Sequence, residues 1–72
     1  MTKDQFKQLQ VGDRFTHPRF IGFFTIAHIE TWYEWPHGPG TPGVETTISI
    51  TTTDGRYLKI DDPDAAQITK LP

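Results

Sequence analysis

The side chains best suited to chemistry in this 72-residue chain are its three histidines, which are candidate metal ligands. His17, His28 and His37 are separated by 11 and nine positions, whereas a local chelate holds two ligands about two to five residues apart. His28 and Glu30 share a face if their segment is extended, but a single pair does not make a metal site. We therefore predict no metal site and expect surface or turn histidines with ordinary titration.

Acidic residues gather at Asp61, Asp62 and Asp64, in a cluster with a superficial likeness to a calcium loop. A calcium loop alternates its oxygen ligands around a central Gly and ends on Glu, and neither feature is present. Helix capping explains the cluster better, because Asp62 can cap a helix and Pro63 suits its first position. The sequence predicts one helical turn here, followed by a short last strand over Gln67–Leu71.

The sequence contains no set of side chains that is suited to catalysis. The chain has no Cys and one Ser, Ser49, which falls in a predicted strand between Ile48 and Ile50, whereas a nucleophile needs exposure and a base. No two carboxylates form an acid and a base in opposed environments; those considered are Glu30, Glu34, Asp61 and Asp62. A chain this short also has little room for a pocket of about 300 Å³, the lower end for ligand sites. We predict that the protein is not an enzyme and uses no cofactor.

The most informative segment is Trp32–Gly43, which is rich in aromatic residues, Pro and Gly. Trp32, Tyr33 and Trp35 fall within four residues and lead into an eight-residue connection with three Pro and three Gly. Most hairpins close in about two to five residues, and a longer loop is more often a binding surface or a mobile segment. Because Trp and Tyr supply contact area at low entropic cost, the segment is a candidate contact surface.

Two interpretations stay open for Tyr33 and Trp35, which either fill the core of a small domain or contact a partner. If both face the core, alternation places Trp32 on the opposite side, beside Glu30 and Glu34. An exposed Trp flanked by carboxylates is the best single candidate for a contact residue.

Nucleic-acid and sugar binding are weaker alternatives. The net charge of −2 and the pI near 5.8 remove general attraction to phosphates. Stacking on bases normally needs a cationic groove, and the cations nearest to Trp32 in sequence are Arg19 and Lys59. A sugar site could use Trp32 with Glu30, Glu34 and His37, and spacing does not separate such a site from a protein-contact surface.

Length and composition predict one small domain that rests on aromatic and β-branched packing, without disulfides. The residues up to Gln10 include charges instead of an apolar stretch of about 7 to 15 residues, and no run approaches about 18 apolar residues. We therefore expect a cytoplasmic protein with no membrane contact.

The chain begins with a predicted helix over about residues 2–10, in which Thr2 and Gln5 form a capping box. Gly12 follows, where the helix would need a left-handed residue to stop. A strand is predicted over Asp13–His17 and a long strand over Phe20–Trp35. The apolar phase of the long strand changes partway, which predicts a bulge near Ala27 and His28.

The register of the next hairpin follows from its hydrophobic pattern. A two-residue Asp54-Gly55 loop would place apolar residues opposite charged ones, whereas a three-residue loop with Gly55 left-handed pairs Ile50 with Leu58 and Ile48 with Ile60. The hydroxyl face opposite the apolar set is uncharged and could lie against another chain, although Thr is also simply a good strand former; its members are Thr47, Ser49, Thr51 and Thr53.

This order of elements resembles the SH3-like small β-barrels: Gly12-Asp13 opening a strand, a long bent second strand, an Asp-Gly hairpin, and a helical turn before Ile68–Leu71. The resemblance implies a mainly β fold, a five-stranded barrel over about residues 13–72 with a short N-terminal helix. The fold hosts peptide binders, nucleic-acid binders, translation-associated domains and a few enzymes, so it implies no single function.

The sequence thus predicts a small non-catalytic binding module that recognises a partner protein. Trp32 and Trp35 would dock with the loop in a partner groove, while Glu30 and Glu34 steer towards a basic patch. Neighbouring contact candidates are Tyr33, Pro36, His37 and Pro39. An accessory or inhibitory protein of a phage or mobile element would fit this description. The alternatives are a nucleic-acid or ribonucleoprotein module that uses Arg14, Arg19, Arg56 and Lys59, and a self-associating, homo-oligomeric structural subunit.

Overall fold

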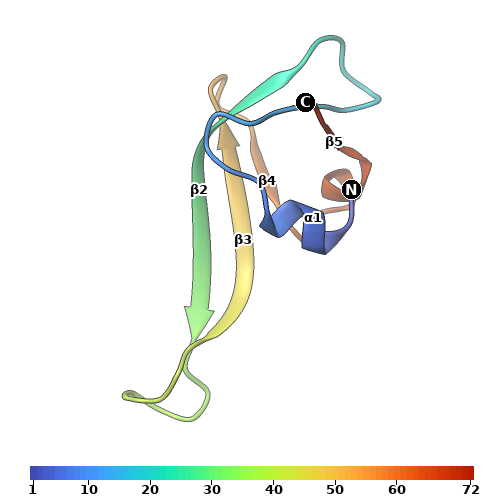
Figure 1. Cartoon of the computed structure of the whole chain (residues 1–72). Helices are drawn as coiled ribbons and strands as arrows, with labels where there is room; N and C mark the ends of the chain where they lie inside the picture. The colour runs from blue at the N-terminus through green and yellow to red at the C-terminus, as the bar shows by residue number, and fades with distance from the viewer.

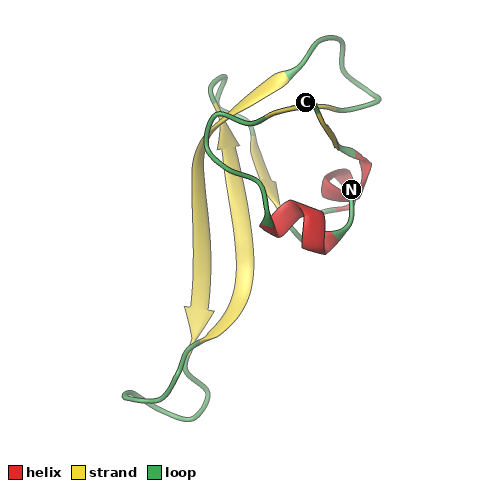
Figure 2. Ribbon diagram, viewed as in Figure 1, coloured by secondary structure: helices red, strands yellow, loops and turns green.

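A computed structural model describes all 72 residues and shows a mainly β chain (Figures 1 and 2). Five antiparallel strands form one sheet in the order β4-β3-β2-β1-β5. The elements in chain order are α1 (Lys3–Lys7), β1 (Arg14–Thr16), β2 (Phe24–Glu34), β3 (Val44–Thr52), β4 (Tyr57–Lys59), the 3-10 helix η1 (Pro63–Gln67) and β5 (Thr69–Lys70). The predicted mainly β class, with five strands, a short helix and a helical turn, is confirmed.

The sheet does not close into a barrel, which corrects the closure that the resemblance implied. β4 and β5 are the two outer strands of the sheet, and they do not pair with each other. Helical segments instead cover the apolar surface between these edges, because Phe6 of α1 and Ala65 of η1 belong to the same buried cluster as the strand residues. The cluster comprises Phe6, Leu9, Phe15, Ile26, Ile48, Ile50, Ile60, Ala65 and Ile68.

The predicted capping box is present at the start of α1. The Thr2 hydroxyl accepts from the Gln5 amide at 3.1 Å, and Gln5 Oε1 accepts from the Thr2 amide at 2.8 Å. The helix ends at Lys7 and not near Gln10, because the Gln10 amide donates to Asp13 Oδ2 at 2.9 Å and starts a separate turn. The helix prediction was therefore right at its beginning and too long at its end.

β2 carries the predicted bulge but begins four residues later than predicted, at Phe24. Ile26 pairs with Thr52 and His28 pairs with Thr51, so Ala27 is the extra residue. The strand starts late because residues 17–23 form turns, one of which is closed by the Phe20 amide donating to the His17 carbonyl at 3.1 Å.

The β3–β4 hairpin has the predicted register. Ile50 pairs with Leu58, the Ile60 amide donates to the Ile48 carbonyl at 2.9 Å, and Gly55 has a φ of +87°. The short turn, in which Gly55 adopts a positive φ, therefore sets the register that places the apolar residues of β3 and β4 opposite each other.

The predicted helical turn is present as η1, with Pro63 near its start, but Asp62 does not cap it with its side chain. Asp62 Oδ2 instead accepts from the Lys59 amide at 2.9 Å. β5 covers Thr69–Lys70 and is shorter than predicted, because η1 continues through Gln67.

The far end of the β2–β3 hairpin projects from the rest of the molecule (Figure 1). We call residues 31–47 the arm, and none of them is buried. The projection gives the chain overall extents of 45 × 20 × 20 Å. The arm therefore adds surface without adding core.

Candidate functional site

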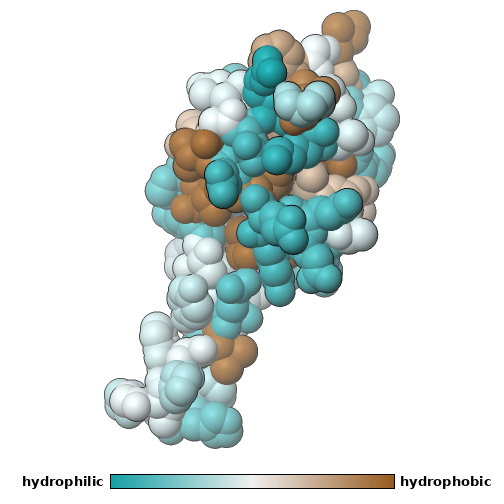
Figure 3. All heavy atoms as spheres, viewed as in Figure 1, coloured by the Kyte–Doolittle hydropathy of each residue, from teal (hydrophilic) through white to brown (hydrophobic).

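The arm exposes the three aromatic side chains that the sequence singled out. Trp32 is 54% exposed, Tyr33 51% and Trp35 54%. Neither Tyr33 nor Trp35 fills the core, so the interpretation of these two residues as core residues is wrong. The reason is geometric, because they lie on the hairpin beyond the point where helices and other strands cover the sheet. Figure 3 shows the arm as a narrow projection of mostly intermediate hydropathy, with one apolar patch.

The three aromatics occupy both faces of the arm. Trp32 pairs with Thr47 and Tyr33 with Glu45, so a second bulge at Thr46 interrupts β3. The Tyr33 and Trp35 rings lie together, with centroids 6.4 Å apart. Because side chains alternate along a strand, Trp32 lies on the opposite face from this pair.

The tip loop, residues 36–43, is organised by its own hydrogen bonds. The Gly38 amide donates to the Trp35 carbonyl at 3.1 Å, and the Thr41 hydroxyl donates to the Gly38 carbonyl at 2.6 Å. Gly38 has a φ of +94°, which only glycine adopts easily. The predicted contact residues Pro36, His37 and Pro39 are exposed on this loop.

A shallow groove of about 300 Å³ lies on the outer face of the sheet beside Trp32. Its other lining residues are Thr46, Thr47, Tyr57 and Lys59. Sequence reasoning missed Tyr57 and Lys59 as neighbours of this face. The hairpin register contained the signal, since it pairs Tyr57 with Thr51 and Lys59 with Ser49. Ser49 itself is only 2% exposed and is not available as a nucleophile.

The arm and the strands that lead to it are acidic. All three glutamates of the chain, Glu30, Glu34 and Glu45, lie between Arg19 and Arg56, and this stretch contains no Lys or Arg. Glu30 Oε1 lies 3.2 Å from His28 Nε2, while Glu34 and Glu45 are exposed. The arm therefore presents aromatic surface together with negative charge.

Two arginines of the body, Arg14 and Arg56, lie over aromatic rings. The Arg56 guanidinium lies 4.4 Å from the Phe20 ring centroid and 5.1 Å from that of Phe24, and Arg14 lies 5.3 Å from that of Phe23. The Thr52 hydroxyl, which donates to the Asp54 carboxylate, lowers the pKa of that carboxyl below its ordinary value, and Arg56 adds to the effect.

A second hollow, of about 290 Å³, lies beside Arg56 and contains His17 at its wall. His17 begins a turn, as expected for one of the two alternatives, but it is only 5% exposed, so the expectation of a surface histidine is wrong for this residue. Its Nδ1 accepts from the Arg19 amide at 3.1 Å, which leaves the proton on Nε2 to donate to Asp64 Oδ1 at 3.2 Å. His17 thereby joins the β1–β2 loop to η1.

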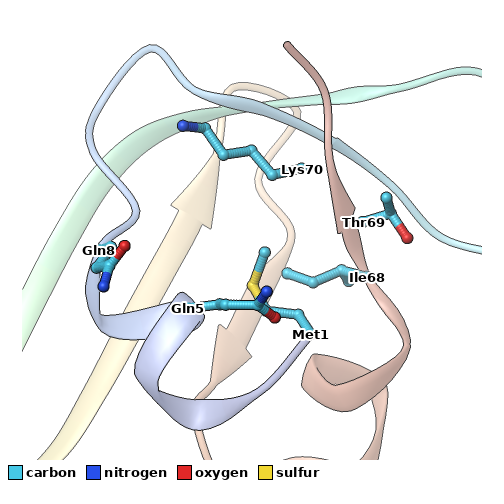
Figure 4. A pocket seen from close by; sticks show the side chains of 6 residues that line it. All are labelled: Met1, Gln5, Gln8, Ile68, Thr69 and Lys70. Atoms are coloured by element: carbon cyan, nitrogen blue, oxygen red, sulfur yellow. The ribbon is translucent and has the colours of Figure 1, made fainter.

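A third hollow lies between α1 and β5 (Figure 4). Its volume is about 440 Å³, and it is lined by Met1, Gln5, Gln8, Ile68, Thr69 and Lys70. Lys70 is the one titratable side chain of this set, so the hollow lacks an acid–base pair. No group of three or more His, Cys, Asp or Glu side chains is placed to hold a metal ion.

Comparison of the chain with protein-family models, with curated proteins and with solved structures finds no match. The chain contains no helix with the length and apolar character to cross a membrane.

Proposed function

We propose that the protein is a non-catalytic binding module that recognises a partner protein through the arm. The observation that carries this proposal is the projecting hairpin on which Trp32, Tyr33 and Trp35 are each about half exposed. Exposed aromatic clusters of this kind are uncommon on monomeric proteins and are typical of contact surfaces.

The charges of the arm support a partner with a basic rim around an apolar groove. Trp32 would fill the groove on one face of the hairpin, or the Tyr33–Trp35 pair would do so on the other. Glu34 and Glu45 would steer the encounter, because complementary charge mainly raises the association rate. The arm has no Lys or Arg, and Lys59 is the one cation that lines the groove beside Trp32. This scarcity of positive charge argues against a nucleic-acid partner, since phosphate contacts supply most of non-specific affinity.

We also propose a relationship to the SH3-like small β-barrels at the level of element order. The strand order, in which β1 joins β2 to β5 and β3 joins β2 to β4, supports the relationship without a closed barrel. An accessory or inhibitory role for a phage or mobile element is compatible with a small binding module.

The proposal is tested by affinity capture from an extract of the source cells, with and without nuclease treatment. The baits are the wild-type chain, Trp32→Ala and Trp35→Ala. Phe23→Ala is the matched control, because Phe23 is 55% exposed but lies outside the arm. Far-UV circular dichroism first confirms that each variant is folded.

We expect a specific protein that survives nuclease treatment, is retained by wild type and Phe23→Ala, and is lost with at least one arm variant. A loss of at least tenfold would correspond to about 1.4 kcal/mol of binding energy, which is reasonable for one hot-spot side chain. Capture that disappears with nuclease and survives both arm substitutions would contradict the proposal and favour the cationic surface of the body.

A further inference from the structure

β2 leaves one of its edges without a strand partner over seven residues, His28–Glu34. On this side, β1 pairs only with Phe24 and Thr25. The backbone of Ile26 is hydrogen-bonded to the Gly12 amide and the Asp13 carbonyl, which lie just before β1. Farther along, β2 is bonded on its other side alone, to β3. An unpaired edge of this length is a template for pairing with another chain.

The two outer strands of the sheet are short and offer less free edge than β2 does. On β4, the outward amide of Lys59 donates to Asp62 Oδ2 at 2.9 Å, and the Lys59 carbonyl accepts from the Asp62 amide at 3.0 Å. β5 has only two residues. The His28–Glu34 edge contains no Lys and no Pro, which are the residues that commonly block edge pairing.

The ladder pattern shows which backbone groups of β2 point outward. The Thr52 amide donates to Arg56 and the Ile48 carbonyl accepts from Ile60, so even-numbered residues of β3 direct their backbone groups towards β4. The odd-numbered residues of β3 therefore direct theirs towards β2.

Two of those residues, Ser49 and Thr47, pair with Glu30 and Trp32. By alternation, the residue between Glu30 and Trp32 turns its own amide and carbonyl outward. That residue is Thr31, at the centre of the seven-residue edge.

We propose that this edge binds the same edge of a second copy of the chain, antiparallel and with Thr31 opposite Thr31. The two central amides would donate to the two central carbonyls across a twofold axis. A symmetric dimer of this kind uses one self-complementary surface twice.

Charge and Pro36 favour this register over the symmetric ones centred on Glu30, Trp32 and Tyr33. A pairing centred on Glu30 would place that carboxylate opposite itself, and one centred on Trp32 would place Glu30 opposite Glu34. Like charges directly opposite destabilise a sheet. A pairing centred on Tyr33 would bring in Pro36, which has no amide to donate.

The register centred on Thr31 gives favourable pairs on both faces. His28 lies opposite Glu34 of the second copy, and Ile29 lies opposite Tyr33 of the second copy. Glu30 lies opposite Trp32 of the second copy, so that no glutamate lies directly opposite another. Aromatic and β-branched residues are among the pairs that stabilise antiparallel strands.

This inference does not rest on the proposed function. The dimer would be held by backbone hydrogen bonds of β2 and would leave Trp35 and the tip loop free, whereas partner recognition would use the exposed aromatic side chains of the arm. Loss of capture with Trp32→Ala and loss of the dimer are separate observations, so either proposal can fail without the other.

The register is tested with single cysteines, which are unique because the natural chain has none. Thr31→Cys places two thiols opposite each other across the axis, with Cα atoms about 5.5 Å apart, a normal separation for a disulfide. Tyr33→Cys is the matched control, because its two thiols would lie about 13 Å apart along the strands. Both proteins are oxidised under the same conditions after circular dichroism has confirmed their folding.

The wild-type chain is measured in parallel by light scattering from micromolar to millimolar concentration, and its amide exchange is followed by NMR. The expected result is a mass approaching twice 8.2 kDa, concentration-dependent protection of the Thr31 amide, and much more cross-linking of Thr31→Cys than of Tyr33→Cys. A single-chain mass at every concentration would overturn the proposal. So would equal cross-linking of the two variants, or a Thr31 amide that exchanges freely in the dimer.

Discussion

The indole of Trp35 packs directly on the backbone of Gly43, so that the two ends of the tip loop are in contact. A Cβ atom placed on Gly43 would lie 3.0 Å from both Cε2 and Nε1 of the Trp35 ring. This contact fixes where the indole lies on the arm, although Trp35 remains 54% exposed.

Substitution Gly43→Ala should therefore displace the Trp35 indole without unfolding the chain. The added methyl group is too close to the ring, but an exposed ring can move away, so we expect a change in unfolding free energy within about 0.5 kcal/mol. The displacement is measured by NMR through the contacts between residue 43 and the indole protons. As a control, Trp32→Ala on the opposite face should leave those contacts intact, and an unmoved indole in Gly43→Ala would contradict the described packing.

Substitution His17→Ala should destabilise the fold by about 2 kcal/mol. It removes hydrogen bonds to the Arg19 amide and to Asp64, and it leaves space in a buried wall. Urea unfolding measures the difference. His28→Ala is the control and should cost less than about 0.5 kcal/mol, because His28 is exposed and its contact with Glu30 is a surface pair. Equal losses of unfolding free energy in the two variants would show that the hydrogen bonds of His17 to Arg19 and Asp64 contribute no more than a surface pair.

The Asp54 carboxylate should make stability depend on pH in the acidic range. Its pKa is lowered from 3.8 by the Thr52 hydroxyl and by Arg56, so the folded state holds the charged form more strongly than the unfolded state does. The resulting stabilisation is complete above the ordinary pKa and is lost as pH falls through the lowered value.

The measurement is urea unfolding from neutral pH to pH about 2, comparing the wild-type chain with Asp54→Asn. The variant should be less stable at neutral pH, and the difference should shrink on acidification. Asp61→Asn serves as a control, since Asp61 has only an exposed contact with Lys3. A difference that stays constant with pH would contradict the assignment.

Substitution Ile50→Ala should remove about half of the stability of the chain. Ile50 is fully buried at the centre of the sheet, and truncation of such a residue costs about 2–5 kcal/mol, compared with an expected total of about 4–11 kcal/mol for a chain of this length. Ile50→Val should cost only about 0.5–1.5 kcal/mol. Thermal and urea unfolding give both values, and a small effect of Ile50→Ala would mean that the core lies elsewhere.

The features that the sequence predicted well depend on neighbours that are close along the chain. Thr2 and Gln5 cap one another within one turn, and Ile50 and Leu58 are aligned by a short loop whose Gly55 can adopt a positive φ. The bulge at Ala27 follows from a change of apolar phase within one strand. For the hairpin and the bulge, the competing arrangement would bury charge or expose apolar side chains, so the local pattern has one good solution.

The features that the sequence could not determine depend on contacts between distant segments. His17 is buried because η1, 47 residues later, brings Asp64 to its Nε2, and no local pattern encodes that meeting. Tyr33 and Trp35 have the residue types of a core, but only the packing of α1 and η1 decided how far along the hairpin the covered surface extends.

The amino-acid sequence by itself thus determined the mainly β class, the hairpin register, the bulge and the aromatic, acidic character of the Trp32–Gly43 segment. Only the tertiary structure decided that the sheet stays open, that the arm projects, and that β2 keeps a free edge along His28–Glu34. The physical reason is that local periodicity fixes which face of a strand is apolar, whereas burial depends on which other segments reach that face.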